Sequence, residues 1–248
     1  MSARFEELAW RETPMGEISL RRRREPSLDV DVFEVKLGDE YLMSSLFTVA
    51  EIELSRLGLA AHPGADLDVL VGGLGLGYTA VAALDDPRVR SLAVVEALPD
   101  VVDWHERGLL PQAARLTSDP RAALVTADFF ATVGAGLPVR EDRPETTYDV
   151  LLVDIDHSPR HLLHPRHAAF YTREGLRQLA GQLHPGGVFG LWSNDPPDDE
   201  FTAVLAGVFD TARAEVVEFD NPLQRRTSAN TVYLAQTART VAPVQGPE

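Results

Sequence analysis

The chain has 248 residues, of which 44% are hydrophobic and 25% are charged, so it has a globular composition that excludes long disorder as its main state. It contains no cysteine, which excludes disulfides, thiolate catalysis and thiolate metal sites. Its formal net charge of −15 disfavours phosphate polyanions, so we expect no nucleic-acid partner.

The N-terminal part of the chain predicts β-structure followed by a helix. Residues 15–45 alternate apolar and polar side chains as strands do, with a turn at residues 25–27. Residues 46–60 carry apolar side chains at helical spacing. We therefore expect a small β-hairpin or sheet and the first helix within residues 1–60.

From residue 67 onward, short apolar strands alternate with helices, two of which we predict at residues 99–110 and 168–183. The predicted strands lie at residues 67–73, 91–97, 123–130, 148–156 and 188–193. Two further strands, at residues 215–221 and 231–237, have only a loop between them and are expected to pair antiparallel. This pattern predicts an α/β fold with a doubly wound, mostly parallel, Rossmann-like seven-stranded sheet containing one antiparallel strand. We assign this domain to residues 61–240 and expect a flexible tail at residues 241–248.

Ligands of such sheets bind where the strands end, and a glycine-rich segment follows the first of these strands. Its glycines let the backbone pass close to a ligand, and the helix after it offers free N–H groups. The cofactor-binding residues predicted in this segment are Gly73, Leu74, Gly75 and Gly77. A tight turn with glycines for packing is the alternative.

Carboxylates end the second and third strands. Glu96, followed by Ala97, lies about 20 residues beyond the glycine segment, where an acidic residue can accept both hydroxyls of a ribose. Asp128 can accept a hydrogen bond from an adenine amino group, while Phe129 can cover a ring face. The alternatives are a capping carboxylate before Pro99 for Glu96 and a helix cap for Asp128.

The fourth strand ends in two carboxylates and an imidazole. We predict Asp154, Asp156 and His157 as catalytic residues, because burial of neighbouring titratable groups can hold a base ready. A turn capped by Asp156 and Ser158 is the structural alternative.

Three more histidines follow His157, at His161, His164 and His167. Such spacings could bind a divalent metal, but two prolines oppose a regular helical display, and we predict a loop over the pocket without metal. Neutral imidazoles there could carry protons or contact an acceptor substrate.

The order of these motifs resembles the spermidine synthases (polyamine aminopropyltransferases), within the class I S-adenosylmethionine-dependent methyltransferase fold. The resemblance covers most of the chain, from the N-terminal strands to Phe170–Tyr171. It implies that Glu96 holds the ribose, Asp128 holds the adenine amine and Asp154 accepts a proton from the attacking amine. It also implies S-adenosylmethionine or decarboxylated S-adenosylmethionine as the donor, and a homodimer.

Other motifs depart from this family. Its glycine loop, GGGDG, has an aspartate where Leu76 stands, and its Tyr-His-Glu segment appears as Val49-Ala50-Glu51. The cationic donor tail thus loses a carboxylate, which favours methyl transfer to a small-molecule acceptor over aminopropyl transfer. A non-catalytic nucleoside-binding or scaffold subunit is a further alternative. An NAD-dependent oxidoreductase fits the dinucleotide-like spacing of Gly75, Gly77 and Ala80 but not the remaining motifs.

No apolar run approaches the roughly 20 residues that span a bilayer. The N-terminal segment is acidic and lacks an apolar signal core. We therefore expect a cytoplasmic protein with no membrane partner.

Overall fold

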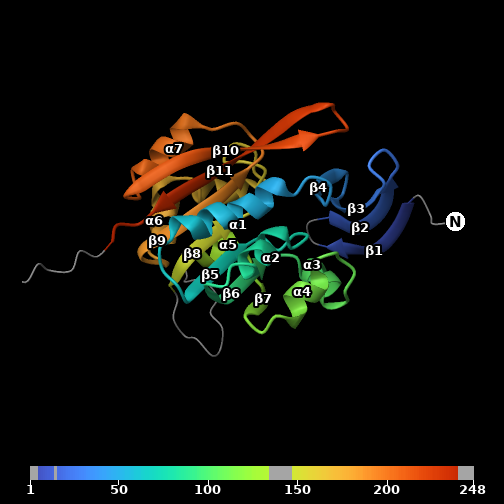
Figure 1. The fold of residues 1–248 in the computed structure, drawn as a ribbon, viewed down its shortest axis with the longest axis horizontal. Coiled ribbons are helices and arrows are strands. Elements are labelled where there is room, and N and C mark those ends of the chain that lie inside the picture. The colour runs from blue at the N-terminus through green and yellow to red at the C-terminus, as the bar shows by residue number, and fades with distance from the viewer. Residues whose placement is uncertain (1–4, 14–15, 134–146, 240–248) are drawn as a thin grey trace, which may run out of the picture.

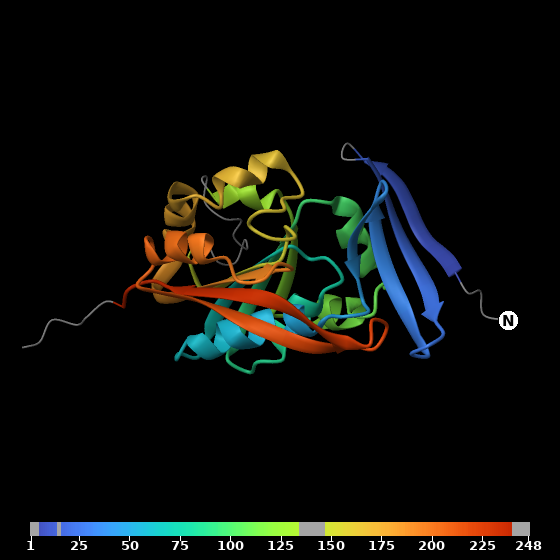
Figure 2. The same cartoon turned by 90° about the horizontal axis from the view of Figure 1, so that it is seen from above.

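The computed structural model describes residues 5–13, 16–133 and 147–239, which form a small N-terminal sheet and a large α/β layer (Figures 1 and 2). The small sheet is antiparallel and four-stranded, in the order β1-β2-β3-β4. Its strands are β1 (Phe5–Thr13), β2 (Gly16–Glu25), β3 (Val30–Leu37) and β4 (Glu40–Ser44). Alternation turns Ile18 and Leu20 into the core. The prediction of a small N-terminal sheet is confirmed, although β1 begins before the residues predicted as strand.

The large sheet has seven strands in the order β10-β11-β9-β8-β5-β6-β7. They are β5 (Leu67–Gly72), β6 (Val89–Glu96), β7 (Ala122–Thr126), β8 (Tyr148–Val153), β9 (Leu183–Ser193), β10 (Thr211–Asn221) and β11 (Arg226–Gln236). Strands β5 to β9 are mutually parallel, and β11 pairs antiparallel with both β9 and β10. The predicted doubly wound sheet with one antiparallel strand is confirmed.

Helices cover both faces of this sheet (Figure 2). One face packs against α1 (Val49–Ala61), α2 (Tyr78–Leu84), α3 (Pro99–Glu106) and α4 (Ala113–Ser118). The other packs against α5 (Phe129–Val133), α6 (Arg173–Ala180) and α7 (Asp199–Ala206). Strand β8 explains the arrangement, because Val150 and Leu152 enter the first core while Leu151 and Val153 enter the second. A strand buried on both faces reads as a continuous apolar run.

Several element bounds differ from those predicted. The helix predicted at residues 99–110 ends at Glu106, because Gly108 adopts a positive φ of 70°, and α4 then follows as a separate helix. The helix predicted at residues 168–183 is replaced by a 3₁₀ turn, η1 (Pro165–Ala169), and by α6. Helix α6 begins after Thr172 because that side chain accepts a hydrogen bond from the Gly175 N–H.

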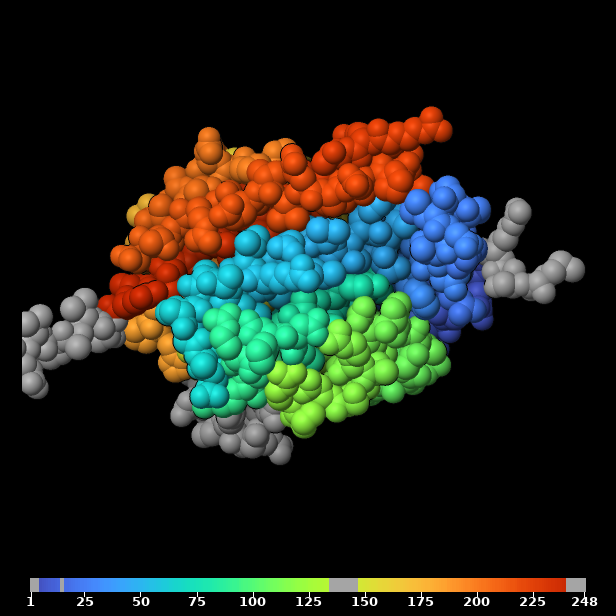
Figure 3. Space-filling view, viewed as in Figure 1, coloured from blue at the N-terminus to red at the C-terminus, as the bar shows by residue number. Residues whose placement is uncertain are grey.

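The N-terminal sheet lies at one end of the large layer, beside the N-terminal end of α1 (Figures 1 and 3). Helix α1 itself packs across β8, β9 and β11, so it covers the large sheet although the sequence division groups it with the N-terminal strands. The predicted tail at residues 241–248 lies outside the described residues. In the part of the chain that the structure describes, no helix is long and apolar enough to cross a membrane.

Candidate active site

A cavity of about 920 Å³ opens at the carboxyl ends of β5, β6, β7 and β8, and β4 of the N-terminal sheet forms part of its wall. This is the edge at which parallel α/β sheets bind ligands. The predicted site residues that line it are Gly73, Leu74, Gly75, Gly77, Glu96, Ala97, Asp128, Phe129, Asp154 and His157. Residues predicted on separate strands therefore meet in one cavity.

The glycine loop between β5 and α2 needs glycine for steric reasons. Gly73, Gly75 and Gly77 have φ values of 94°, 48° and 88°, which side chains with a Cβ rarely adopt. A Cβ on Gly73 would lie 2.1 Å from the backbone oxygen of Asp154. The loop can therefore lie directly against the end of β8, where it forms one wall of the cavity.

His105 of α3 makes a hydrogen bond to the backbone of this glycine loop. Its Nε2 lies 2.9 Å from the Gly75 carbonyl oxygen, and the side chain is fully buried. Burial lowers the pKa of His105, so the neutral ring donates through Nε2–H to that carbonyl. Sequence reasoning missed this residue, because a histidine within a helix carries no local sign of a contact 30 residues away.

Glu96 ends β6 and is almost completely buried in the cavity wall. One carboxylate oxygen accepts a hydrogen bond from the Leu74 N–H at 3.1 Å, and the other accepts one from the Leu98 N–H at 2.9 Å. Burial raises the pKa of Glu96, and these backbone donors act against that rise. Glu96 thus connects the glycine loop to the turn after β6, so the capping alternative describes one of its contacts.

Asp128 stands exposed in the cavity at the end of β7. Its Oδ1 accepts a hydrogen bond from the Ala131 N–H at 3.1 Å, as expected of a helix cap. The ring of Phe129 is nearly buried and packs against Gly72, where a Cβ would lie 2.8 Å from the ring. Phe130 also lines the cavity beside them.

Asp154 follows β8 and interacts electrostatically with Glu51, a residue to which the sequence analysis assigned no role. The Thr79 hydroxyl donates to Asp154 Oδ2 at 2.7 Å. Burial raises the pKa of Asp154 to about 6, although the Thr79 hydrogen bond lowers it. Glu51 of α1 lines the same cavity, and burial, followed by the charge of Asp154, raises the pKa of Glu51 to about 8. Near neutral pH the pair therefore holds about one negative charge, centred on Asp154.

Asp156 does not line the cavity, although the sequence predicts it as catalytic. It is 1% exposed, and its carboxylate accepts hydrogen bonds from the Leu163 N–H at 2.7 Å and the Tyr171 hydroxyl at 2.9 Å. Nδ1 of His167 lies 2.8 Å from the same carboxylate. The side chain thus contacts, from inside the protein, the loop that carries the four histidines, residues 157–167, which we call the histidine loop.

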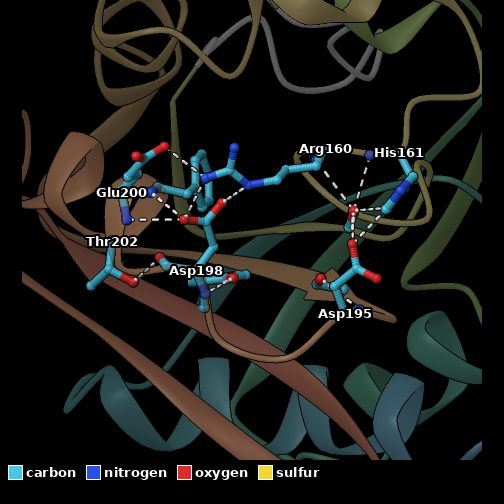
Figure 4. A network of polar contacts seen from close by, with 10 residues as sticks. Arg160, His161, Asp195, Asp198, Glu200 and Thr202 are labelled. Atoms are coloured by element: carbon cyan, nitrogen blue, oxygen red, sulfur yellow. Dashed lines mark hydrogen bonds and ion pairs between the residues drawn. The ribbon is translucent and has the colours of Figure 1, made fainter.

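The histidine loop divides into an inner and an outer side. His157, His164 and His167 line the cavity, and His157 Nε2 lies 3.1 Å from Glu40 Oε1 of β4. His161 instead lies outside, with Nδ1 2.7 Å from Asp195 Oδ2 (Figure 4).

Ion pairs hold the outer side of the loop to the segment after β9. Arg160 donates to Asp198 at 2.6 Å and to Glu200 at 2.7 Å (Figure 4). Among the described residues, no group of three His, Asp or Glu side chains is arranged to hold a metal ion.

No protein-family model matches the chain, and no curated protein matches it in sequence. Its fold is similar to that of spermidine synthase from Thermotoga maritima, with a TM-score of 0.70 at 18% identity over 96% of this chain and 75% of that one. A spermidine synthase in complex with the transition-state analogue AdoDATO has a TM-score of 0.69 at 18% identity, over 96% of this chain and 74% of that one. A probable spermidine synthase from Corynebacterium glutamicum has a TM-score of 0.62 at 17% identity, over 92% of this chain and 79% of that one. The chain therefore has the spermidine synthase-like form of the class I methyltransferase fold, as its sequence motifs predict.

Proposed function

We propose that this protein is a transferase that uses an adenosylsulfonium donor and moves the aminopropyl group of decarboxylated S-adenosylmethionine to a small amine. The observation that carries the proposal is the meeting of the glycine loop, Glu96, Asp128 and Asp154 in one cavity. The fold adds support, because one solved structure with this fold is a spermidine synthase in complex with AdoDATO.

The donor would lie along the carboxyl edge of the sheet. The Glu96 carboxylate accepts from the Leu74, Gly75 and Leu98 N–H groups, and its contact with the Gly75 N–H is long, at 3.5 Å, so that acceptor position can pass to a ribose hydroxyl. Asp128 is exposed in the cavity and can accept from an adenine amino group. The glycine loop allows the donor tail to approach the backbone closely.

Asp154 is suited to act as the general base. A carbon bound to positive sulfur is already activated, so the protein needs chiefly to align the nucleophile and remove its proton. As the amine nitrogen bonds to that carbon, the C–S electron pair returns to sulfur and Asp154 accepts the proton. A base whose pKa is about 6 is ionised at neutral pH, and such catalysis contributes on the order of 10²–10⁴ in rate.

Glu51 supports aminopropyl rather than methyl transfer. Leu76 lines the cavity where the resembling family has an aspartate, which is why the sequence favours a methyltransferase. Glu51, however, brings another carboxylate into the same cavity from α1. An ammonium group bound nearby would favour its ionised form. The solved structures with this fold also favour the aminopropyl alternative.

Product analysis separates the two reactions. The protein is incubated with either decarboxylated S-adenosylmethionine or S-adenosylmethionine, together with a panel of α,ω-diamines and monoamines. Aminopropyl transfer releases methylthioadenosine, whereas methyl transfer releases S-adenosylhomocysteine, and mass spectrometry identifies both. We expect methylthioadenosine and an aminopropylated amine.

Two glutamine variants on α1 provide the matched comparison. Glu51→Gln is expected to raise the KM for the decarboxylated donor, whereas Glu53→Gln, whose carboxylate pairs with Arg56 at 2.9 Å, is expected to leave it unchanged. Release of S-adenosylhomocysteine alone would overturn the aminopropyl assignment. Consumption of neither donor, together with no binding of methylthioadenosine by calorimetry, would overturn the transferase.

A further inference from the structure

Two neighbouring imidazoles, those of His164 and His167, line the cavity with opposite hydrogen-bonding character. The centres of their rings lie 5.9 Å apart. Each ring uses Nδ1 within the protein, so its other nitrogen is the group left for a ligand.

The tautomer of His167 follows from Asp156. The Asp156 carboxylate accepts from a backbone N–H and from the Tyr171 hydroxyl, and a carboxylate has no hydrogen to give. Nδ1 of His167, 2.8 Å from this carboxylate, must therefore carry the hydrogen. The neutral ring consequently has a lone pair on Nε2 and acts there only as a hydrogen-bond acceptor.

The tautomer of His164 is the reverse. Its Nδ1 accepts a hydrogen bond from the Arg166 backbone N–H at 3.1 Å, because a backbone nitrogen can only donate. The hydrogen of the neutral ring then lies on Nε2, which is a donor. His164 and His167 together offer one donor and one acceptor.

The orientation of His167 is also restricted by packing. Its ring stacks on Phe130, with centroids 3.9 Å apart and planes at 23°. Phe130 lies two residues after Asp128, on the wall that carries the carboxylate assigned to the adenine amine. Asp156 and Phe130 thus hold the acceptor edge of His167 beside the position expected for a nucleobase.

We propose that His164 and His167 read the edge of a 6-aminopurine, with His167 Nε2 accepting one hydrogen of the exocyclic amino group, whose other hydrogen is left for Asp128, and His164 Nε2–H donating to a neighbouring ring nitrogen. This inference rests on the proposed function, because it requires a bound adenosyl group. Adenine presents an amino donor at this edge, whereas a 6-oxopurine presents an oxygen acceptor in its place. An oxygen lone pair facing the lone pair of His167 would be repelled, so the two histidines act together with Asp128 in determining which base the site accepts.

Calorimetric binding of two nucleosides tests the assignment. Methylthioadenosine and its 6-oxo counterpart, methylthioinosine, are titrated into the protein at pH 8, above the range in which free imidazole titrates. The test variant His167→Phe keeps a ring against Phe130 but has no acceptor, and His164→Phe removes the donor. His161→Phe is the matched control, because His161 lies on the outer side of the same loop. Thermal melting verifies that each variant is folded.

We expect wild-type protein and His161→Phe to prefer methylthioadenosine. His167→Phe should bind methylthioadenosine about tenfold more weakly, the loss expected for one hydrogen bond. It should bind methylthioinosine more tightly than the wild type does, because the repulsion between the base oxygen and the His167 lone pair is removed. His164→Phe should also weaken methylthioadenosine binding.

Two other results would overturn the inference in distinguishable ways. If His167→Phe weakened both nucleosides equally, or kept the wild-type preference, His167 would not read the base, and the proposed transferase would stand. If wild-type protein bound neither nucleoside, this inference would fail, and if it also consumed neither donor, the proposed function would fail with it.

Discussion

The Glu51–Asp154 pair makes the stability of the protein depend on pH in a direction that can be worked out. Burial and the charge of Asp154 raise the pKa of Glu51 from 4.5 to about 8. An acid with a higher pKa in the folded state holds its proton more tightly when the protein is folded. The contribution of Glu51 to the stability of the folded protein is therefore fully present below pH 4.5 and is lost as the pH rises toward about 8.

Glu51→Gln removes this dependence while keeping the size of the side chain. Each pH unit between the unfolded and folded pKa corresponds to about 1.4 kcal/mol. With an allowance for the partial exposure of Glu51, ionisation destabilises the wild type by on the order of 3 kcal/mol. The variant should match the wild type near pH 4 and exceed its free energy of unfolding by about that amount near pH 9.

Urea denaturation followed by circular dichroism, at several pH values from 4 to 9, measures the difference. Glu53→Gln on the same helix is the control, since its surface pair with Arg56 should contribute within about 0.5 kcal/mol at every pH. If the free energies of unfolding of Glu51→Gln and wild type differed by the same amount at every pH in this range, the pKa of Glu51 would be the same in the folded and unfolded protein. The electrostatic coupling between Glu51 and Asp154 would then be refuted.

Three further substitutions test the site around Asp154, and Gly108→Ala serves as the control for one of them. Asp154→Asn should lower kcat by about 10²–10⁴ and leave calorimetric binding of methylthioadenosine nearly unchanged, and a loss below tenfold would remove Asp154 as the base. Wild-type kcat should rise with pH through about 6, because Asp154 must be ionised to act as the base. Thr79→Val should move that rise to higher pH, because the Thr79 hydroxyl lowers the pKa of Asp154. A pH profile that did not move would assign the titration to another group. Gly73→Ala should destabilise the protein by roughly 3 kcal/mol or more in urea denaturation, because its Cβ would lie 2.1 Å from the Asp154 carbonyl oxygen. Gly108→Ala, with φ of 70° and open space around it, should cost only about 1–2 kcal/mol, and equal losses would show that the clash is relieved.

Much of the donor half of the cavity could be predicted from sequence. Glu96, Asp128 and Asp154 each follow an apolar strand, and the parallel strands of such a sheet end at one edge. Local pattern therefore predicts that these carboxylates lie near one another. The glycine loop is predictable for a similar reason, because its place between a strand and a helix is a local feature.

The orientations of other side chains required the folded chain. Nothing near Asp156 in the sequence shows that its carboxylate turns inward to Tyr171 and His167, while Asp154 faces the cavity. The outward position of His161 likewise depends on Asp195, which lies in the loop that follows β9.

The sequence by itself determined the order of strands in the large sheet's half of the chain, the antiparallel pair and the strand ends at which polar groups gather, because strand alternation, apolar runs and glycine turns are properties of neighbouring residues. Only the tertiary structure decided that Glu51 of α1 shares a cavity with Asp154 and that His105 holds the glycine loop. These contacts join residues distant in the chain, and the pKa values and tautomers that they produce depend on burial and on the partner's charge, which arise only when the core has formed.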